Sequence, residues 1–169
     1  MEQLIQILKG LLADTVALQY KAQGYHWNVE TDDFPQYHEF FGKIYEDYES
    51  AIDPMAEWIR MLGGYAPFKL SRFTELTSLP ETEVTSDHEE MSMDLYKANE
   101  MMISKFQDAF DVATAARQQG LANFLAERQT AHQKWSWQLK ATVSEMLAEE
   151  AMPEQPEMPE EPEAPTVTA

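Results

Sequence analysis

Chemistry in this chain must come from histidines, carboxylates and hydroxyls, because none of its 169 residues is a cysteine. The missing cysteines exclude a disulfide framework, thiolate chemistry and any cysteine-based zinc site. The four histidines are His26, His38, His88 and His132. Asp53 and Glu57 stand four residues apart, so on a helix both carboxylates project from one face about one turn apart. Imidazoles and carboxylates together are ligands suited to iron, zinc or manganese.

The elements that must position these residues are helices. Apolar residues recur every three or four positions in four long segments, about 2–28, 33–62, 86–119 and 121–150. The sequence predicts Asp33 as an N-cap, a Ser86–Glu89 capping box, and helix ends at Gly63–Gly64 and Gly120. A short helix over 71–77 is expected on the long connection between the second and third helices. Four long helices with one long crossover predict an all-α, ferritin-like four-helix bundle.

The composition divides the chain into two parts. Residues 1–151 are expected to form one bundle domain. Residues 152–169 contain five prolines and five glutamates and no basic residue, which predicts an extended, disordered tail. No run approaches the ~18 apolar residues of a membrane span, so no membrane partner is expected. The first residues lack the basic start of a secretory signal, which predicts a cytoplasmic protein.

The charge favours cations as partners. The chain has 12 basic and 30 acidic residues, a formal net charge of −18. Such a surface repels phosphate backbones, which disfavours DNA binding, and it attracts metal cations.

The spacing of the candidate ligands predicts a site shared by two chains. A short turn brings His26 beside His38, but His38 and Asp53 are 15 residues apart, roughly 22 Å along one helix. Ligands lie ~2 Å from a metal, so one chain cannot supply both halves to one ion. If the second helix packs antiparallel on its own copy near residue 46, the two histidines of one chain meet Asp53 and Glu57 of the other. Aromatic residues expected at that interface are Phe40, Phe41, Tyr45 and Tyr48.

An intrachain di-metal site is not expected. Such sites in ferritin-like bundles use Glu-x-x-His pairs. The residues three positions before the four histidines are Gln23, Pro35, Thr85 and Gln129.

The ordered set Tyr25-His26-Trp27-Asn28, Phe34-x-x-x-His38-x-x-Phe41 and Ala51-Ile52-Asp53-x-x-x-Glu57 through Gly64 resembles the Dps mini-ferritin family. The resemblance covers about residues 4–148. It implies a dodecameric shell built from two-fold dimers that oxidises iron(II), with hydrogen peroxide or oxygen, and stores ferric mineral as oxidative protection. The family's ligands fall on His26, His38, Asp53 and Glu57, with zinc as a substitute for iron.

The chain departs from the family pattern in three places. Gly42 stands where members often carry an acidic residue one turn after the second histidine. Pro54 lies beside the carboxylate pair and removes one backbone hydrogen bond from the helix. At the positions that line the iron-entry pores of the family, Gln118 and Asn123 are neutral, which leaves Glu127 as the charged lining residue.

Two other functions compete with the ferroxidase. One is a non-catalytic interaction protein, an acidic helical bundle whose Pro/Glu tail docks a partner. The other is a shell that binds metal without turnover, which Gly42 would favour. Among the remaining candidates, His88 and His132 are expected to be non-functional, and Trp27, Trp135 and Trp137 to serve packing.

Overall fold

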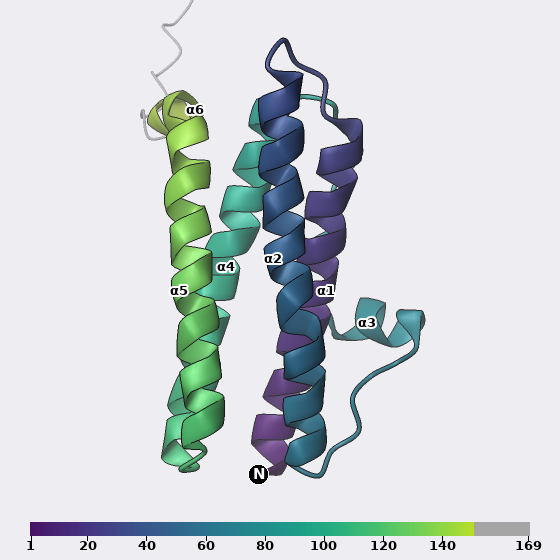
Figure 1. The fold of residues 1–169 in the computed structure, drawn as a ribbon, viewed down its shortest axis with the longest axis vertical. Coiled ribbons are helices and arrows are strands. Elements are labelled where there is room, and N and C mark those ends of the chain that lie inside the picture. The colour runs from purple at the N-terminus through teal and green to yellow at the C-terminus, as the bar shows by residue number, and fades with distance from the viewer. Residues whose placement is uncertain (151–169) are drawn as a thin grey trace, which may run out of the picture.

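The computed structural model describes residues 1–150, in which every regular element is a helix. Four long helices stand side by side: α1 (Glu2–Asn28), α2 (Phe34–Met61), α4 (His88–Ala115) and α5 (Gln119–Thr142) (Figure 1). The connection 62–87 carries α3 (Leu70–Leu76) and returns along the outside of α1, so α2 and α4 run in the same direction. This arrangement confirms the predicted bundle with one long crossover. The predicted tail and the boundary at residue 151 lie outside the described residues.

The apolar residues that gave the helical periodicity form one core. Fully buried side chains come from all four long helices, among them Leu8, Ile44, Leu95 and Leu125. The interface predicted from the aromatic residues of α2 is partly wrong, because Phe41 and Tyr48 are fully buried inside their own bundle. Of the four aromatic residues predicted at the interface, only Phe40 and Tyr45 are partly exposed. None of the helices in residues 1–150 is long and apolar enough to cross a membrane.

Three predicted helix boundaries are wrong: the start of α4, the break before α5 and the end of α5. The cap of α4 is Asp87, whose Oδ1 accepts from the Glu89 and Glu90 amides at 2.8 and 3.0 Å. The break before α5 falls at residues 116–118, where Arg117 takes the left-handed φ of 58° expected of a glycine. Gly120 instead lies inside α5, where an added Cβ would stand 3.0 Å from the Trp58 ring.

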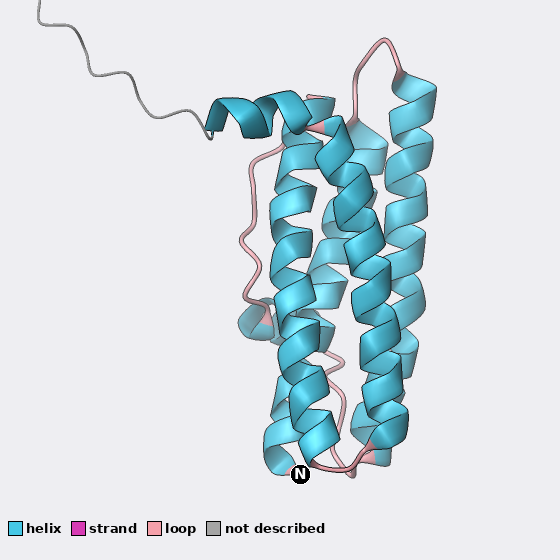
Figure 2. Ribbon diagram, turned by 90° about the vertical axis from the view of Figure 1, so that its left-hand side faces the viewer, coloured by secondary structure: helices cyan, strands magenta, loops and turns pink. Residues whose placement is uncertain are grey.

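At the C-terminal end, the helix predicted to reach residue 150 breaks at Val143. A separate short helix, α6 (Ser144–Glu150), turns across the end of the bundle (Figure 2). At the other end, Asp33 is the N-cap residue of α2 as predicted, although its side chain makes no cap hydrogen bond.

The Gly63–Gly64 pair ends α2 as predicted. Gly63 has a φ of 91°, which L side chains rarely adopt. At Gly64, a Cβ would come within 2.7 Å of Ile5 Cγ2, so only glycine lets this turn pack directly on α1.

The crossover is tied to the bundle at two levels by polar contacts. At the lower level, the buried carboxylate of Asp14 accepts from Thr77 Oγ1 at 2.9 Å and from the Ser78 amide at 2.7 Å. Lys105 Nζ lies 2.7 Å from the same carboxylate and balances its charge. A buried carboxylate needs this full set of donors, since an unpaired charge in a core is strongly destabilising.

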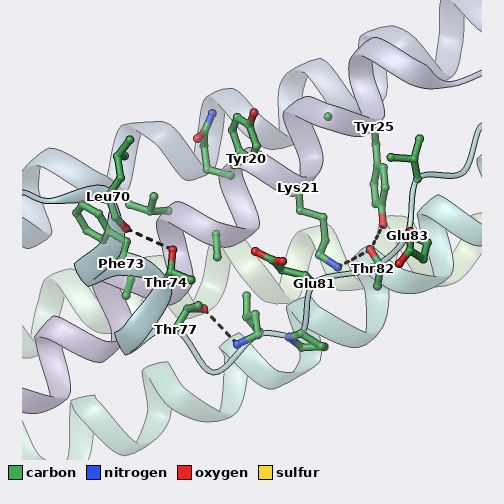
Figure 3. A pocket seen from close by; sticks show the side chains of 18 of the residues that line it. Tyr20, Lys21, Tyr25, Leu70, Phe73, Thr74, Thr77, Glu81, Thr82 and Glu83 are labelled. Carbon is green, nitrogen blue, oxygen red and sulfur yellow. Dashed lines mark hydrogen bonds between the residues drawn. The ribbon is translucent and has the colours of Figure 1, made fainter.

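At the upper level, Thr82 of the crossover bonds to Lys21 and Tyr25 of α1 (Figure 3). Both of these side chains also reach Asp94 on α4, at 2.5 and 2.6 Å. Burial, followed by the hydrogen bond to Asp94, raises the pKa of the Tyr25 phenol. A cavity of about 650 Å³ lies between α1 and the crossover, and its polar side chains Lys21, Tyr25 and Thr82 already bond to their neighbours.

A polar network crosses the middle of the core. His132, with no exposed surface, stacks on Tyr48 with ring centroids 5.0 Å apart. Asn99 Oδ1 accepts from His132 Nδ1 at 2.6 Å and from the Tyr48 hydroxyl at 3.0 Å. This amide oxygen can only accept, so the Nδ1 atom carries the proton. His132 Nε2 has no hydrogen-bond partner within residues 1–150. Burial and the nearby charge of Arg128 lower the pKa of His132 to about 3.

A bidentate ion pair joins α2 to α5 beside this network. The Arg128 guanidinium donates to both oxygens of Asp47 at 3.1 and 2.8 Å, and Trp135 Nε1 adds a bond of 2.8 Å. Burial acts to raise the pKa of the Asp47 carboxyl, but the bonds from Arg128 and Trp135 outweigh it, and the pKa lies below its usual value. The α1–α2 pair and the α4–α5 pair are therefore joined by an ion pair as well as by apolar contact.

The lowered pKa of His132 predicts acid-sensitive stability. The unfolded chain binds a proton at its imidazole near pH 6.5, whereas the folded chain resists protonation down to about pH 3. The contribution of the uncharged, buried His132 ring to the free energy of unfolding is therefore fully present above pH 6.5. It is lost as the pH falls from 6.5 to about 3. The total stabilisation lost is on the order of 5 kcal/mol per chain. Urea unfolding by circular dichroism at fixed chain concentration should show a flatter pH dependence for His132→Phe, which removes the titrating ring and leaves Asn99 bonded to Tyr48.

His88→Gln is the matched control, because His88 lies partly exposed against Tyr37. It should keep the wild-type slope. An unchanged slope in His132→Phe would contradict the assignment.

Candidate metal centre

The turn between α1 and α2 places His26 and His38 in direct contact. Their rings stack with centroids 3.7 Å apart and an angle of 20° between the planes. The two residues also exchange hydrogen bonds. His26 Nδ1 donates to the His38 carbonyl at 2.6 Å, and His38 Nδ1 donates to the His26 carbonyl at 2.7 Å. The end of one helix and the start of the next are therefore bound together by the candidate ligands themselves.

These two bonds fix the chemistry of both rings. A carbonyl oxygen can only accept, so each Nδ1 carries a proton, and the lone pair of the neutral form lies on Nε2. Within residues 1–150, no hydrogen bond involves Nε2 of His26 or His38. Anchoring one imidazole nitrogen to a carbonyl is the usual way in which a protein orients the other nitrogen toward a metal. The pair thus offers two oriented nitrogen donors.

The packing around the pair holds the rings in place. Phe34 stacks on the outer face of His38 at 5.0 Å, and Tyr45 meets His26 edge-on at 5.3 Å. Gly42 lies directly beside His26, where a Cβ would be 3.3 Å from Nδ1 and 3.4 Å from Cε1. Gly42 therefore supplies no ligand, and its lack of a side chain leaves room for the ring.

The carboxylates lie at the other end of α2. Asp53 and Glu57 are exposed and share one face of the helix, and the helix continues past Pro54 to Met61. The described part of the chain contains no cluster of three or more histidine, aspartate or glutamate residues that could hold a metal. The structure thus brings the two histidines together and leaves the two carboxylates apart from them, as the helical spacing requires.

The other two histidines lie outside the pair, and Trp27 is largely exposed rather than packed in the core as expected. His88 packs its ring edge against Tyr37 at 4.4 Å, and His132 belongs to the core network. Trp27 is 57% exposed beside Tyr20.

Sequence reasoning missed the exchanged bonds of the pair and the Asp47–Arg128 link. The sequence could have indicated a partner for Asp47, since this residue lies next to Tyr48 and three residues from Ile44 on the apolar side of α2. The exchanged bonds had none, because they depend on the path of the turn.

Comparison with known proteins supports this architecture. The model of the ferritin-like domain matches residues 5–147. DNA protection during starvation protein 2 of Bacillus anthracis is 26% identical over 144 residues, covering 85% of this chain and 99% of that protein. A low temperature-induced protein of Nostoc is 28% identical over 151 residues, covering 82% and 79%. The crystal structure of a Dps protein from Bacillus brevis superposes with a TM-score of 0.81 at 26% identity, over 84% of this chain and 95% of that one.

The contact between Gly42 and His26 predicts an effect on metal binding. Gly42→Ala should displace the His26 ring by a few tenths of an ångström and weaken cobalt(II) binding about three- to tenfold, since ligand geometry must hold within about half an ångström. Cobalt(II) absorbance titration of the wild type and the variant measures this.

Gly24→Ala is the matched control, because a Cβ at that helical glycine meets nothing within 4 Å. It should leave the binding constant unchanged. Equal affinities in Gly42→Ala and the wild type would show that the His26 ring is not a constrained ligand.

Proposed function

The chain belongs to the ferritin-like family, as a Dps-like mini-ferritin, and from this premise we propose that it is a ferroxidase that oxidises iron(II) and stores the ferric product. The observation that carries the proposal is the pair of stacked histidines, in which both Nδ1 atoms are anchored and neither Nε2 atom has a hydrogen bond within residues 1–150. In a shell built from two-fold dimers, each pair would face Asp53 and Glu57 of a second copy. The shell is proposed to be a dodecamer in the cytoplasm.

The proposed division of labour follows from the ligand types. His26 and His38 bind the iron(II) substrate as neutral donors, and Asp53 and Glu57 of the second copy offset its charge. Carboxylates bind iron(III) more strongly than iron(II), so they favour the oxidised product. Hydrogen peroxide takes two electrons, so one peroxide and two protons convert two iron(II) ions to two iron(III) ions and two water molecules. Removing both reagents together suppresses hydroxyl-radical formation, which supports a protective role.

The charge of the chain supports storage rather than DNA binding. A net charge of −18 draws cations toward the shell and repels a phosphate backbone. Several relatives are named for DNA protection during starvation. For this chain we propose that such protection acts through iron and peroxide, without DNA contact. Zinc is proposed as a substitute ion at the same ligands, since it accepts the same donor set.

Iron(II) oxidation by added hydrogen peroxide, followed as soluble ferric absorbance, tests the proposal. The wild type should oxidise iron well above a protein-free control and keep it in solution. His38→Ala should fall to the control rate, because it removes one nitrogen donor and the ring that stacks on His26.

His88→Ala should oxidise iron at the wild-type rate, since His88 lies outside the pair. Full activity in His38→Ala would overturn the site.

Mixed assemblies test whether two chains share the site. His38→Ala and Glu57→Gln should each be inactive alone. A dimer of one chain of each kind rebuilds one intact site, so co-refolding equal amounts should restore about a quarter of the wild-type activity by the two-fold symmetry. A site contained within one chain would recover nothing, and that result would rule out the shared centre.

A shell that binds metal without turnover is the second candidate, and Gly42 is the observation that favours it. Gly42 leaves the space beside His26 without a further carboxylate. Cobalt(II) binding with iron oxidation at the control rate would select this function. A chain that neither binds metal nor assembles would instead fit a non-catalytic interaction protein.

A further inference from the structure

Exposed apolar side chains are concentrated on one side of the bundle. Eleven large apolar side chains are exposed within residues 1–150, and nine of them lie in residues 1–87, which form α1, α2 and the crossover. The helices α4 and α5 contribute only Met101 and Trp137. The crossover packs along α1, and α1 packs on α2, so these elements form one continuous side of the molecule (Figure 1). Apolar surface gathered on one side in this way is typical of an interaction site.

On this side, exposed aromatic residues gather at two ends. At the first end, Trp27 and Phe34 lie where α1 leads into α2. At the second end, Tyr65 and Phe68 follow the last turn of α2 and are 79% and 86% exposed. Because α2 is 28 residues long, its two termini are ~40 Å apart. The aromatic residues of one end therefore cannot cover those of the other end within one chain.

Charge divides the two ends in the same way. Residues 22–42, which include the first end, contain no lysine or arginine, whereas residues 58–74, which include the second end, contain no aspartate or glutamate. Asp32 is exposed at the first end, and Arg60 and Lys69 are exposed at the second. None of these three side chains takes part in an ion pair within residues 1–150. The first end is thus acidic and the second basic, and their charges are available to a partner.

A second copy in antiparallel register brings unlike ends together. The proposed metal centre has α2 crossing its own copy near residue 46. Arg60 lies 14 residues after that point and Asp32 lies 14 residues before it, so a two-fold axis there sets each Arg60 at the level of Asp32 of the other copy. Arg60 also follows Asp53 by seven residues, close to two helical turns, so both lie on the same exposed face of α2.

We propose that a second copy of this chain covers the outer side of α1, α2 and the crossover, with the acidic first end of each copy seated on the basic second end of the other. This inference rests on the proposed function, because it takes the antiparallel register from the shared metal centre. It adds the surface that holds the two copies and the charges that select the register. A parallel pair of chains would set like charges together at both ends, which opposes association.

Cross-linking in the absence of metal tests the surface. The chain has no cysteine, so Thr31→Cys with Met61→Cys supplies two thiols beside the charged residues and leaves those residues unchanged. The two positions lie at opposite ends of α2 and are too far apart to link within one chain. A short bismaleimide should therefore give covalent dimers on a denaturing gel.

Thr31→Cys with Gln119→Cys is the matched control. Gln119 is exposed at the start of α5, at the same end of the bundle as Met61 (Figure 1). This pair should stay monomeric. Equal dimer yields from the two pairs would overturn the proposal. Dimers from Thr31→Cys alone would show the parallel arrangement and would also overturn it.

Charge reversal within the Thr31→Cys, Met61→Cys chain tests the pairing. Arg60→Asp should lower the dimer yield about tenfold, because it sets like charges together at both ends. Asp32→Arg should lower it similarly, and the two reversals together should restore it. Arg117→Asp, which reverses an exposed charge at the α4–α5 turn, should leave the yield unchanged. A double reversal that stays as low as the single ones would contradict the pairing.

These readouts involve no metal, so they separate the surface from the proposed ferroxidase. Cross-linked dimers from a chain that fails to oxidise iron would support the surface and count against the ferroxidase. Iron oxidation by a wild-type chain whose cysteine pair stays monomeric would overturn the surface and leave the ferroxidase in place.

Discussion

Along α2, the rise of ~1.5 Å per residue keeps His38 and Asp53 roughly 22 Å apart, and the proposed metal centre depends on that separation. The helix runs without interruption from Phe34 to Met61, so no bend inside one chain brings the two ligand types together. The chain offers nitrogen donors at one end and carboxylates at the other. A metal centre that uses all four ligands then requires a second copy in antiparallel register. The centre can therefore form only when two chains assemble.

The rest of the bundle keeps α2 straight and correctly placed. Asp47 near its midpoint bonds to Arg128 and Trp135 of α5, while the core network of Tyr48, Asn99 and His132 joins it to α4 and α5. On the other side, the Gly64 turn packs on Ile5, and the exchanged histidine bonds close the opposite end. These polar contacts have directional geometry, so they fix the orientation of α2 more closely than apolar packing alone. The same burial lowers the pKa of His132.

Sequence periodicity predicted the helices, their order and the long crossover, because burial of an apolar stripe decides helix formation over more than twenty residues. It failed where single contacts decide. Asp87 rather than Ser86 caps α4, and Arg117 rather than Gly120 takes the left-handed turn. The separation of histidines from carboxylates followed from helix geometry alone. The exchanged bonds between His26 and His38 did not, since they depend on the path of residues 29–33, for which no periodic pattern exists. Phe41 and Tyr48 were misplaced because an aromatic side chain suits a core and an interface equally well.

Anomalous diffraction from crystals soaked in iron(II) under anaerobic conditions tests the shared centre most directly. The account predicts iron within about 2.0–2.3 Å of Nε2 of His26 or of His38, or one ion at each, with carboxylate oxygens of Asp53 and Glu57 from a second copy completing the shell. A peak held by ligands of one chain, or one placed away from the histidine pair, would contradict it.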